Sequence, residues 1–306
     1  TALCSFLQWG ARMVLIANPR DMKGLVKECE KQHFTVICGV NTLFNGLLNT
    51  QGFDKVDFKM LKLTIGGGTQ VQKSVAERWK EITGGHIIEA YGLTECSPGV
   101  AANPMNTPWN GSVGFPFPST VVSIRGEGFK DLGFWTTPQE IPEHTGEICV
   151  KGPQVMRGYW DKPEETAAVL RDGWLRTGDL GTMDASGNIF IRGRLKSMIL
   201  SSSGQNIFPE ELETKLNNLP FILESLVIER NKKLVALVYA DYEALDSLGL
   251  NNPNNLKTIM DENLKNLNSN VAAYEKISRI QLYPTEFEKT PKRSIKRYLY
   301  NSIAVD

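Results

Sequence analysis

The sequence predicts an α/β fold with a mostly parallel sheet, followed by a β-rich segment and a small α+β domain. Strands and helices alternate along the first ninety or so residues, which is typical of a parallel sheet covered by helices. From about Val113 the pattern changes to short β-like runs punctuated by Gly and Pro, and from about Arg194 it changes again. A chain of 306 residues suits one large domain with a smaller one, or two domains of moderate size.

In the first region, apolar runs that end at Gly or Asn-Pro alternate with amphipathic stretches. The expected strands are Arg12–Ala17, Phe34–Cys38, Leu61–Ile65 and His86–Glu89. The expected helices are Asp21–Gln32, Leu43–Leu48 and Val71–Thr83. Residues 1–8 resemble the middle of an amphipathic helix without an initiator Met, so we expect a fragment that begins inside a domain.

The later regions carry shorter elements. The expected β-like runs are Val121–Arg125, Glu147–Lys151 and Asn188–Arg192. They are followed by a helix at Pro209–Asn217, a hairpin of Leu226–Glu229 with Leu234–Tyr239 turning at Asn231-Lys232, a polar helix near Asn255–Leu267 and a strand at Ile277–Tyr283. We expect two domains, residues 1–192 with a β-rich subdomain at about 113–192, and residues 193–306 after a hinge near Gly193.

Composition excludes several classes of protein. The chain has 34 basic and 34 acidic residues, whereas a nucleic-acid binder would need a basic surface. No run of about 18 apolar residues occurs, so we expect no bilayer span. Five scattered cysteines and three histidines predict neither a disulfide framework nor a zinc site and favour a cytoplasmic protein.

Two polar motifs follow expected strands of the first sheet. Gly66-Gly67-Gly68 would let the backbone approach a flat or anionic ligand, or would make a sharp strand–helix turn. The motif Tyr91–Glu95 (YGLTE) also follows an expected strand, and we expect it at the same edge of the sheet as the glycines. The Glu95 carboxylate beside the Thr94 hydroxyl suits a Mg²⁺ ion that bridges nucleotide phosphates. Thr94 and Glu95 equally suit a helix N-terminus. Cys96 is not expected to be a nucleophile because no base is placed beside it.

Further motifs lie in the later regions. Trp174–Asp179 (WLRTGD) places an acidic residue in a glycine turn, where it could accept ribose hydroxyls or form a structural Asx turn. The segment 193–196 (GRLK) leads to 204–211 (GQNIFPEE). The polar run Ser201–Asn206 predicts an exposed loop, and Pro209 suits the first turn of a helix. The basic tail 292–297 is either a solvated face or the source of a lysine delivered to a phosphate.

The order and spacing of these motifs resemble the ANL superfamily of acyl-CoA synthetases, luciferases and peptide-synthetase adenylation domains. Residues 18–49 and 75–104 are specifically similar to bacterial long-chain fatty acyl-CoA synthetases. The resemblance covers essentially the whole chain. It implies part of a large ANL-type N-terminal domain followed by a small mobile C-terminal domain.

The resemblance also implies roles for individual residues. The nucleotide pocket would be lined by Gly66, Gly67, Gly68, Tyr91 and Gly92. Thr94 would contact a phosphate, Glu95 would bind Mg²⁺, Asp179 would hold the ribose hydroxyls and Arg194 would reach the ribose. Lys196 lies just beyond the hinge, the Gly204 loop would complete the thioester-forming site, and Lys296 would be the adenylation lysine.

The implied reaction is ATP-dependent activation of a fatty acid to acyl-AMP, followed by transfer to CoA. The substrates would be a fatty acid, ATP and CoA, with Mg²⁺ as cofactor and peripheral contact with the inner membrane as a further possibility. An aromatic or succinylbenzoate-like acid, and a non-catalytic remnant of the fold, are the alternative hypotheses.

Three departures from the family pattern matter. Gly193 stands where the family usually has Asp before Arg194, although glycine suits a hinge. The tail PKRSIK is one residue shorter than the family spacing and lacks its Gly, which makes Lys292 the alternative to Lys296. The family's Ser/Thr/Gly-rich phosphate loop does not occur in the 306 residues, so we expect this chain alone to bind ATP poorly.

Overall fold

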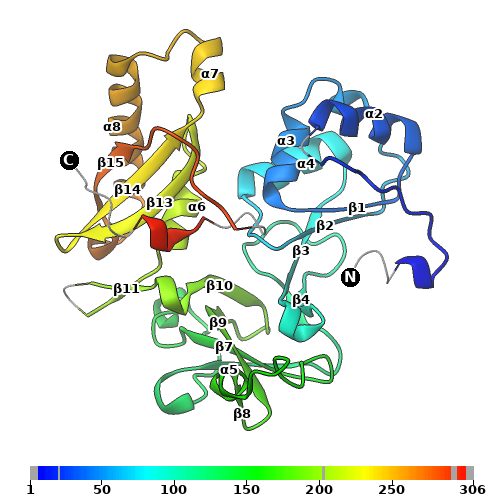
Figure 1. Cartoon of the computed structure of the whole chain (residues 1–306), viewed down its shortest axis with the longest axis vertical. Coiled ribbons are helices and arrows are strands. Elements are labelled where there is room, and N and C mark those ends of the chain that lie inside the picture. The colour runs from blue at the N-terminus through cyan, green and yellow to red at the C-terminus, as the bar shows by residue number, and fades with distance from the viewer. Residues whose placement is uncertain (1–5, 20, 202–203, 291–294, 301–306) are drawn as a thin grey trace. The chain divides into compact units, whose positions relative to one another are not determined.

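The computed structural model of the chain describes residues 6–19, 21–201, 204–290 and 295–300. The chain divides into two compact units, Thr1–Ile191 and Arg192–Asp306, each with its own elements (Figure 1). The division falls beside Gly193, the position at which the sequence suggests a hinge.

The first unit contains a five-stranded sheet of order β1-β2-β3-β4-β5. Its strands are β1 (Val36–Gly39), β2 (Leu63–Gly67), β3 (Ile87–Gly92), β4 (Gly99–Ala102) and β5 (Phe115–Pro116). Strands β1 to β3 are parallel, and β4 and β5 extend the sheet in antiparallel fashion. Helices α2 (Met22–Gln32), α3 (Asn41–Leu48) and α4 (Lys73–Thr83) lie together beside β1 to β3 (Figure 1).

Aromatic side chains fill the space between these helices and the sheet. Phe44 on α3 and Trp79 on α4 are fully buried and meet edge to face, with ring centroids 4.9 Å apart. The Trp79 indole N–H donates to Thr64 Oγ1 on β2 at 3.2 Å, so the one polar atom of this large side chain is satisfied in the core.

The strand expected over Arg12–Ala17 does not form. This segment is irregular and belongs to no sheet, and Leu15 in its middle is 76% exposed. Arg12 donates from Nη2 to Gln32 Oε1 at the end of α2 (3.0 Å) rather than facing a neighbouring strand. The prediction of a strand is wrong because most side chains of this apolar run are not buried against the sheet.

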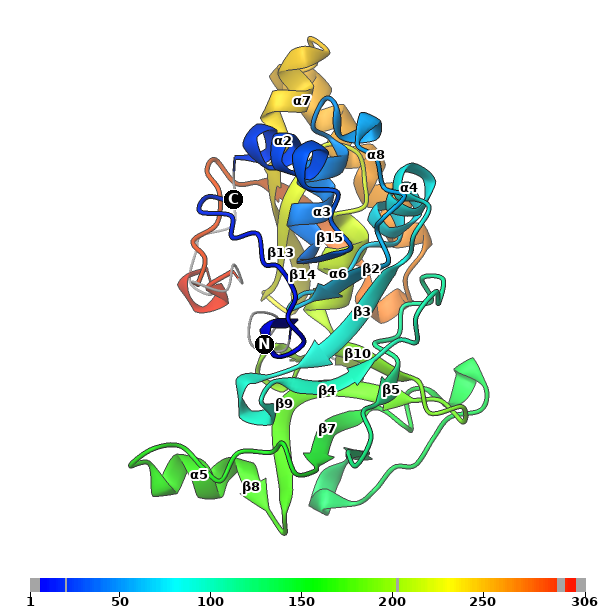
Figure 2. The same cartoon turned by 90° about the vertical axis from the view of Figure 1, so that its right-hand side faces the viewer.

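A second, antiparallel sheet has the order β10-β9-β7-β6, with β8 paired to β9 (Figure 2), and its strand β10 continues past the boundary of the first unit at Ile191. Its elements are β6 (Val121–Arg125), β7 (Gly146–Lys151), α5 (Pro163–Val169), β8 (Leu170–Arg171), β9 (Trp174–Met183) and β10 (Ile189–Arg194). Tyr91 and Val100 of the first sheet share one buried cluster with Ile124, Ile148 and Leu175 of the second. This shared core brings the end of β3 to the middle of β9, at Asp179.

The second unit is a small α+β structure. Its elements are the hairpin β11 (Ile199–Leu200) and β12 (Asn206–Ile207), helices α6 (Pro209–Leu216), α7 (Tyr242–Ser247) and α8 (Pro253–Ser269), and strands β13 (Ile222–Arg230), β14 (Lys233–Ala240) and β15 (Ile277–Leu282). Strand β14 is central, antiparallel to β13 and parallel to β15. Asn231 and Lys232 both have positive φ, as the expected tight hairpin turn requires.

Side chains of β13 and β14 alternate between two cores. One face of the sheet packs with α6 and α8 through residues such as Val227 and Leu212, and the other packs with Phe287 and Tyr300. In the part of the chain that the structure describes, no helix has the length and apolar character needed to cross a membrane.

Candidate active site

The glycine triplet straddles the end of β2. Gly66 and Gly67 lie within the strand, paired with Glu89 and Ala90 of β3, whereas Gly68 follows with φ +79°. A Cβ on Gly66 would lie 2.7 Å from the side chain of Val71, so packing requires this glycine. A Cβ on Gly67 would meet the Ala90 carbonyl oxygen at 3.4 Å, an ordinary contact. Packing therefore requires glycine at position 66 and the positive φ favours it at position 68, whereas the surrounding fold places no such demand on Gly67.

Glu89 supports the segment that follows these glycines. Its carboxylate is 4% exposed and accepts a hydrogen bond from Val71 N at 3.0 Å. Burial raises the pKa of Glu89 to about 7, while the Val71 hydrogen bond favours the ionised form. The sequence does not indicate this role of Glu89, because a single acidic residue in an apolar strand gives no signal of its partner.

Tyr91 and Asp179 meet although they lie on different sheets. The Tyr91 hydroxyl donates to Asp179 Oδ2 at 2.6 Å, and the two residues are 8% and 5% exposed. The YGLTE and WLRTGD motifs therefore meet through their aromatic and acidic residues. A short hydrogen bond to a carboxylate is among the stronger polar contacts in proteins.

Asp179 lies in a continuous strand and not in the glycine turn that the sequence suggested. Strand β9 runs through it, and a register shift opposite Glu147 and Cys149 inserts a bulge. Gly178, with φ +73°, donates its N–H to Glu147 Oε1 at 3.0 Å, and Arg176 Nε donates to Oε2 at 2.8 Å. The buried Glu147 thus stabilises the bulge that lies next to Asp179.

Thr94 and Glu95 occupy a single 3-10 turn (Thr94–Cys96) directly after β3. Gly92 permits this turn, because a Cβ there would lie 2.0 Å from the Pro98 carbonyl oxygen. Thr94 is exposed and Glu95 is half-buried. Cys96 is fully buried, and burial raises the pKa of its thiol to about 11, which disfavours the thiolate.

Tyr159 is a partner of Glu95 that the sequence does not indicate. Its hydroxyl donates to Glu95 Oε1 at 2.9 Å, and the Glu95 carbonyl oxygen accepts from Met156 N at 2.8 Å. Both contacts come from the segment between β7 and α5. An aromatic residue in a glycine-containing loop has many structural roles, so sequence alone did not indicate this one.

A metal ion at Glu95 would have to share its coordination with a ligand. Among the described residues, no group of three or more His, Cys, Asp or Glu side chains could hold a metal ion together. Mg²⁺ commonly takes one or two carboxylates together with phosphate oxygens and waters. A single carboxylate held in place by Tyr159 fits that pattern.

The other expected site residues belong to the second unit. Arg194 is exposed at the end of β10, and Gly204 is exposed in the β11–β12 hairpin loop with φ +81°. Gly204 N donates to the Ser201 carbonyl oxygen at 3.0 Å. Lys296 is half-buried, with Nζ 3.2 Å from Glu288 Oε2. Its alternative, Lys292, lies outside the described residues.

The residue before the expected hinge is bound to the second unit. Arg192 Nε lies 2.6 Å from Glu211 Oε1 on α6, and its guanidinium lies over the Phe208 ring, 5.5 Å from the centroid. Gly193 follows directly. These contacts anchor the start of the second unit immediately before a glycine.

A profile of AMP-binding enzymes matches residues 1–160, which is more than half of the chain. The chain belongs to the AMP-binding enzyme family. This result confirms the resemblance to adenylate-forming enzymes.

Individual relatives of the family are closely similar over most of the chain. A long-chain-fatty-acid–CoA ligase of Haemophilus influenzae is 52% identical over 209 residues, covering 68% of this chain and 36% of the relative. A ligase of the same name from Yersinia pestis is 49% identical over 224 residues, covering 73% and 38%. This AMP-binding chain thus spans less than two-fifths of the length of these relatives.

A solved structure confirms the adenylate-forming fold. The crystal structure of ATP-bound MatB from Rhodopseudomonas palustris matches 92% of this chain and 52% of its own, with a TM-score of 0.76 and 25% identity.

Proposed function

We propose that the protein in its natural full length is an AMP-forming long-chain fatty acid–CoA ligase. The observation that carries the proposal is the Tyr91–Asp179 hydrogen bond, which joins the two most distinctive motifs of an AMP-binding family member. The long-chain fatty acid is supported by relatives of that name at 49% and 52% identity.

In the first step, a carboxylate oxygen of the acid attacks the α-phosphorus of ATP, and the bond from that phosphorus to the bridging oxygen of the pyrophosphate breaks. Asp179 holds the ribose hydroxyls, Arg194 reaches the ribose, and Gly67 lets the nucleotide approach the backbone. Lys296 offsets negative charge on the α-phosphate, an effect worth about 3–4 kcal/mol for a well-placed group. A Mg²⁺ ion bound at Glu95, beside Thr94, would supply further charge stabilisation to the phosphates.

In the second step, the CoA thiol loses its proton, its sulfur attacks the acyl carbon and the carbon–oxygen bond to AMP breaks. The second unit would turn about Gly193 between the steps, which would break the Arg192–Glu211 ion pair across this glycine, withdraw Lys296 and bring in the Gly204 loop. The position of Gly193, one residue past the first residue of the second unit, supports this proposal.

The proposal places the enzyme in the cytoplasm, in keeping with the free cysteines at positions 29, 38, 96 and 149. It includes peripheral contact with the membrane, into which long-chain acids partition.

The test is to incubate the full-length protein with ATP, Mg²⁺, CoA and a mixture of carboxylic acids, and to detect acyl-CoA by mass spectrometry. We expect long-chain thioesters to dominate, and Asp179→Ala to abolish them. Thioesters of aromatic or succinylbenzoate-like acids alone would redirect the proposal to another ligase, and no thioester from any acid would indicate a non-catalytic remnant.

A further inference from the structure

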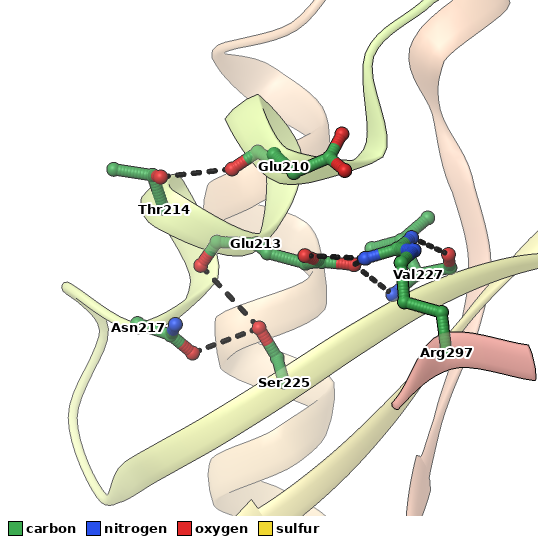
Figure 3. Close-up of polar contacts among 7 residues, drawn as sticks. All are labelled: Glu210, Glu213, Thr214, Asn217, Ser225, Val227 and Arg297. Atoms are coloured by element: carbon green, nitrogen blue, oxygen red, sulfur yellow. Dashed lines mark hydrogen bonds and ion pairs between the residues drawn. The ribbon is translucent and has the colours of Figure 1, made fainter. Parts of the chain in front are cut away.

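Arg297, the residue directly after Lys296, is fixed to a helix 84 positions earlier in the chain. Its Nη1 donates to Oε1 and Oε2 of Glu213 on α6, at 2.7 and 2.8 Å (Figure 3). Its Nη2 donates to the Val227 carbonyl oxygen at 2.8 Å. Three charge-assisted hydrogen bonds therefore hold one guanidinium in a single orientation.

Glu213 and Arg297 together complete the edge of a sheet. Val227 lies on β13, the edge strand of the order β13-β14-β15. Its N–H donates to Glu213 Oε1 at 2.7 Å, and its carbonyl oxygen accepts from Arg297 (Figure 3). The two side chains thus take the place of a neighbouring strand. This closed arrangement links α6, β13 and the segment that carries Lys296.

Glu213 is itself held rigidly. It is 9% exposed, and its backbone carbonyl oxygen lies 3.3 Å from Ser225 Oγ. The single hydrogen of that hydroxyl is shared with the closer acceptor Asn217 Oδ1 at 2.8 Å (Figure 3). Burial raises the pKa of the Glu213 carboxyl, and the Arg297 guanidinium beside it favours the ionised form. The backbone and the carboxylate of Glu213 are therefore both held by contacts within the second unit.

Lys296 is held through its backbone more firmly than through its side chain. Its N–H donates to the Glu288 carbonyl oxygen at 2.8 Å, and Tyr300, four residues later, is 4% exposed in an aromatic cluster with Phe287. In contrast, Nζ contacts the side chain of Glu288, which is 67% exposed. An exposed ion pair of this kind contributes little energy, so the lysine side chain is easily released to another anion.

We propose that Glu213 is a positioning residue for adenylation, which holds Lys296 in place through Arg297. The inference rests on the proposed function, in which the Lys296 ammonium meets the α-phosphate. A charged group must meet the reacting atoms within a fraction of an ångström, and a misplacement of about 1 Å can cost about a hundredfold in rate. Without the contacts of Arg297, Lys296 would remain in the second unit, but its ammonium would be positioned less precisely relative to the α-phosphate.

A purely structural role makes a different prediction. Buried ion pairs often contribute little net stability, and a folding defect would lower both half-reactions together. A residue that acts through Lys296 affects the first half-reaction, because the lysine takes part in that step alone.

The experiment compares the two half-reactions in the full-length protein. Acid-dependent exchange of labelled pyrophosphate into ATP reports the first, and thioester formation from CoA and synthetic acyl-adenylate reports the second. We expect Glu213→Gln to lower exchange about tenfold to a hundredfold and to change thioester formation less than about twofold. In a Lys296→Ala background, Glu213→Gln should cause no further loss of exchange.

Two further variants make the test robust. Arg297→Lys keeps the charge opposite Glu213 but cannot reproduce the fork that also reaches Val227, and it should lower exchange in the same selective way. Asn263→Ala is the structural control: Asn263 is 4% exposed on α8 and donates to the Pro220 carbonyl oxygen at 2.9 Å, away from Lys296. It should destabilise the unit and spare exchange.

Equal losses in both half-reactions for Glu213→Gln, or unchanged exchange in both Glu213→Gln and Arg297→Lys, would overturn the positioning role and leave the proposed function intact. Absence of exchange in the wild type would instead overturn the proposed function, and this inference with it.

Discussion

The Tyr91 hydroxyl donates to Asp179 Oδ2 at 2.6 Å, across two sheets and 88 positions of sequence. Both residues are almost fully buried, so water does not compete for this hydrogen bond. The contact joins the end of β3 to the bulge of β9 and holds two residues of the proposed nucleotide pocket in place.

Removing this hydroxyl should loosen Asp179 without removing its charge. We predict that Tyr91→Phe raises the KM for ATP in pyrophosphate exchange about three- to tenfold, because a hydrogen bond to a charged group contributes about 1 kcal/mol or more. Tyr242→Phe is a matched control in the other unit, on a tyrosine whose ring packs against Tyr239. An unchanged KM in Tyr91→Phe would show that Asp179 needs no support from this hydroxyl.

Tyr159→Phe should weaken the dependence on Mg²⁺. The variant removes the donor to Glu95 Oε1, so the carboxylate rotates more freely and the Mg²⁺ concentration for half-maximal exchange should rise about threefold to tenfold. A titration with Mg²⁺ at saturating ATP measures this. If the titration curve of Tyr159→Phe overlaid that of the wild type, Glu95 would not act at the metal in the way we propose.

Gly204→Val should block the second half-reaction. Gly204 has φ +81°, which a β-branched residue adopts at a cost of roughly 1–2 kcal/mol, so the loop should shift and thioester formation should fall about tenfold while exchange is retained. Gly249→Val is the control, since Gly249 also has positive φ and an added Cβ would meet nothing within 4 Å at either glycine. Comparable loss of both half-reactions in Gly204→Val would count against the domain rotation.

Glu89 should make the first unit less stable as pH rises. Its folded-state pKa of about 7 lies above the ordinary value of 4.5, so the folded state binds the proton more tightly, and stability present below pH 4.5 is lost as pH rises through about 7. Relative to wild type, Glu89→Gln should gain on the order of 2 kcal/mol in unfolding free energy between pH 5 and pH 8. Urea denaturation at several pH values measures this, and a pH-independent difference would contradict the assignment.

Phe44→Ala should cost about 3–5 kcal/mol, because Phe44 is fully buried against Trp79. Phe134→Ala, at a side chain that is 55% exposed, should change stability by less than about 0.5 kcal/mol. All six tryptophans precede the boundary at Ile191, so tryptophan fluorescence during urea denaturation follows the first unit. Similar losses in the two variants would mean that the helices do not pack on the sheet as described.

Local sequence patterns predicted most helices and strands. The predictions were wrong where burial or a distant partner segment determines the structure. The helix Met22–Gln32 and the hairpin turn at Asn231-Lys232 follow from periodicity and turn chemistry. The Arg12–Ala17 run has the apolar residues of a strand but no partner strand, which a single segment does not reveal.

The site shows the same division. Tyr91, Glu95 and Asp179 stand out in the sequence motifs. The contact of Tyr91 with Asp179 depends on two sheets that share a core, and Glu95 contacts a loop tyrosine 64 positions away. Glu213 likewise looks like an ordinary acidic residue in an amphipathic helix, and its role emerges only when the tail folds back onto β13.

The most direct test of the central claim follows the oxygen atoms of the carboxylate. A long-chain fatty acid labelled with heavy oxygen in both carboxylate positions is incubated with the full-length protein, ATP, Mg²⁺ and CoA, and the nucleotide product is analysed by mass spectrometry. If the carboxylate attacks the α-phosphate, AMP carries one heavy oxygen and acyl-CoA retains the other. Unlabelled AMP, or label in inorganic phosphate with ADP as the nucleotide product, would contradict the account.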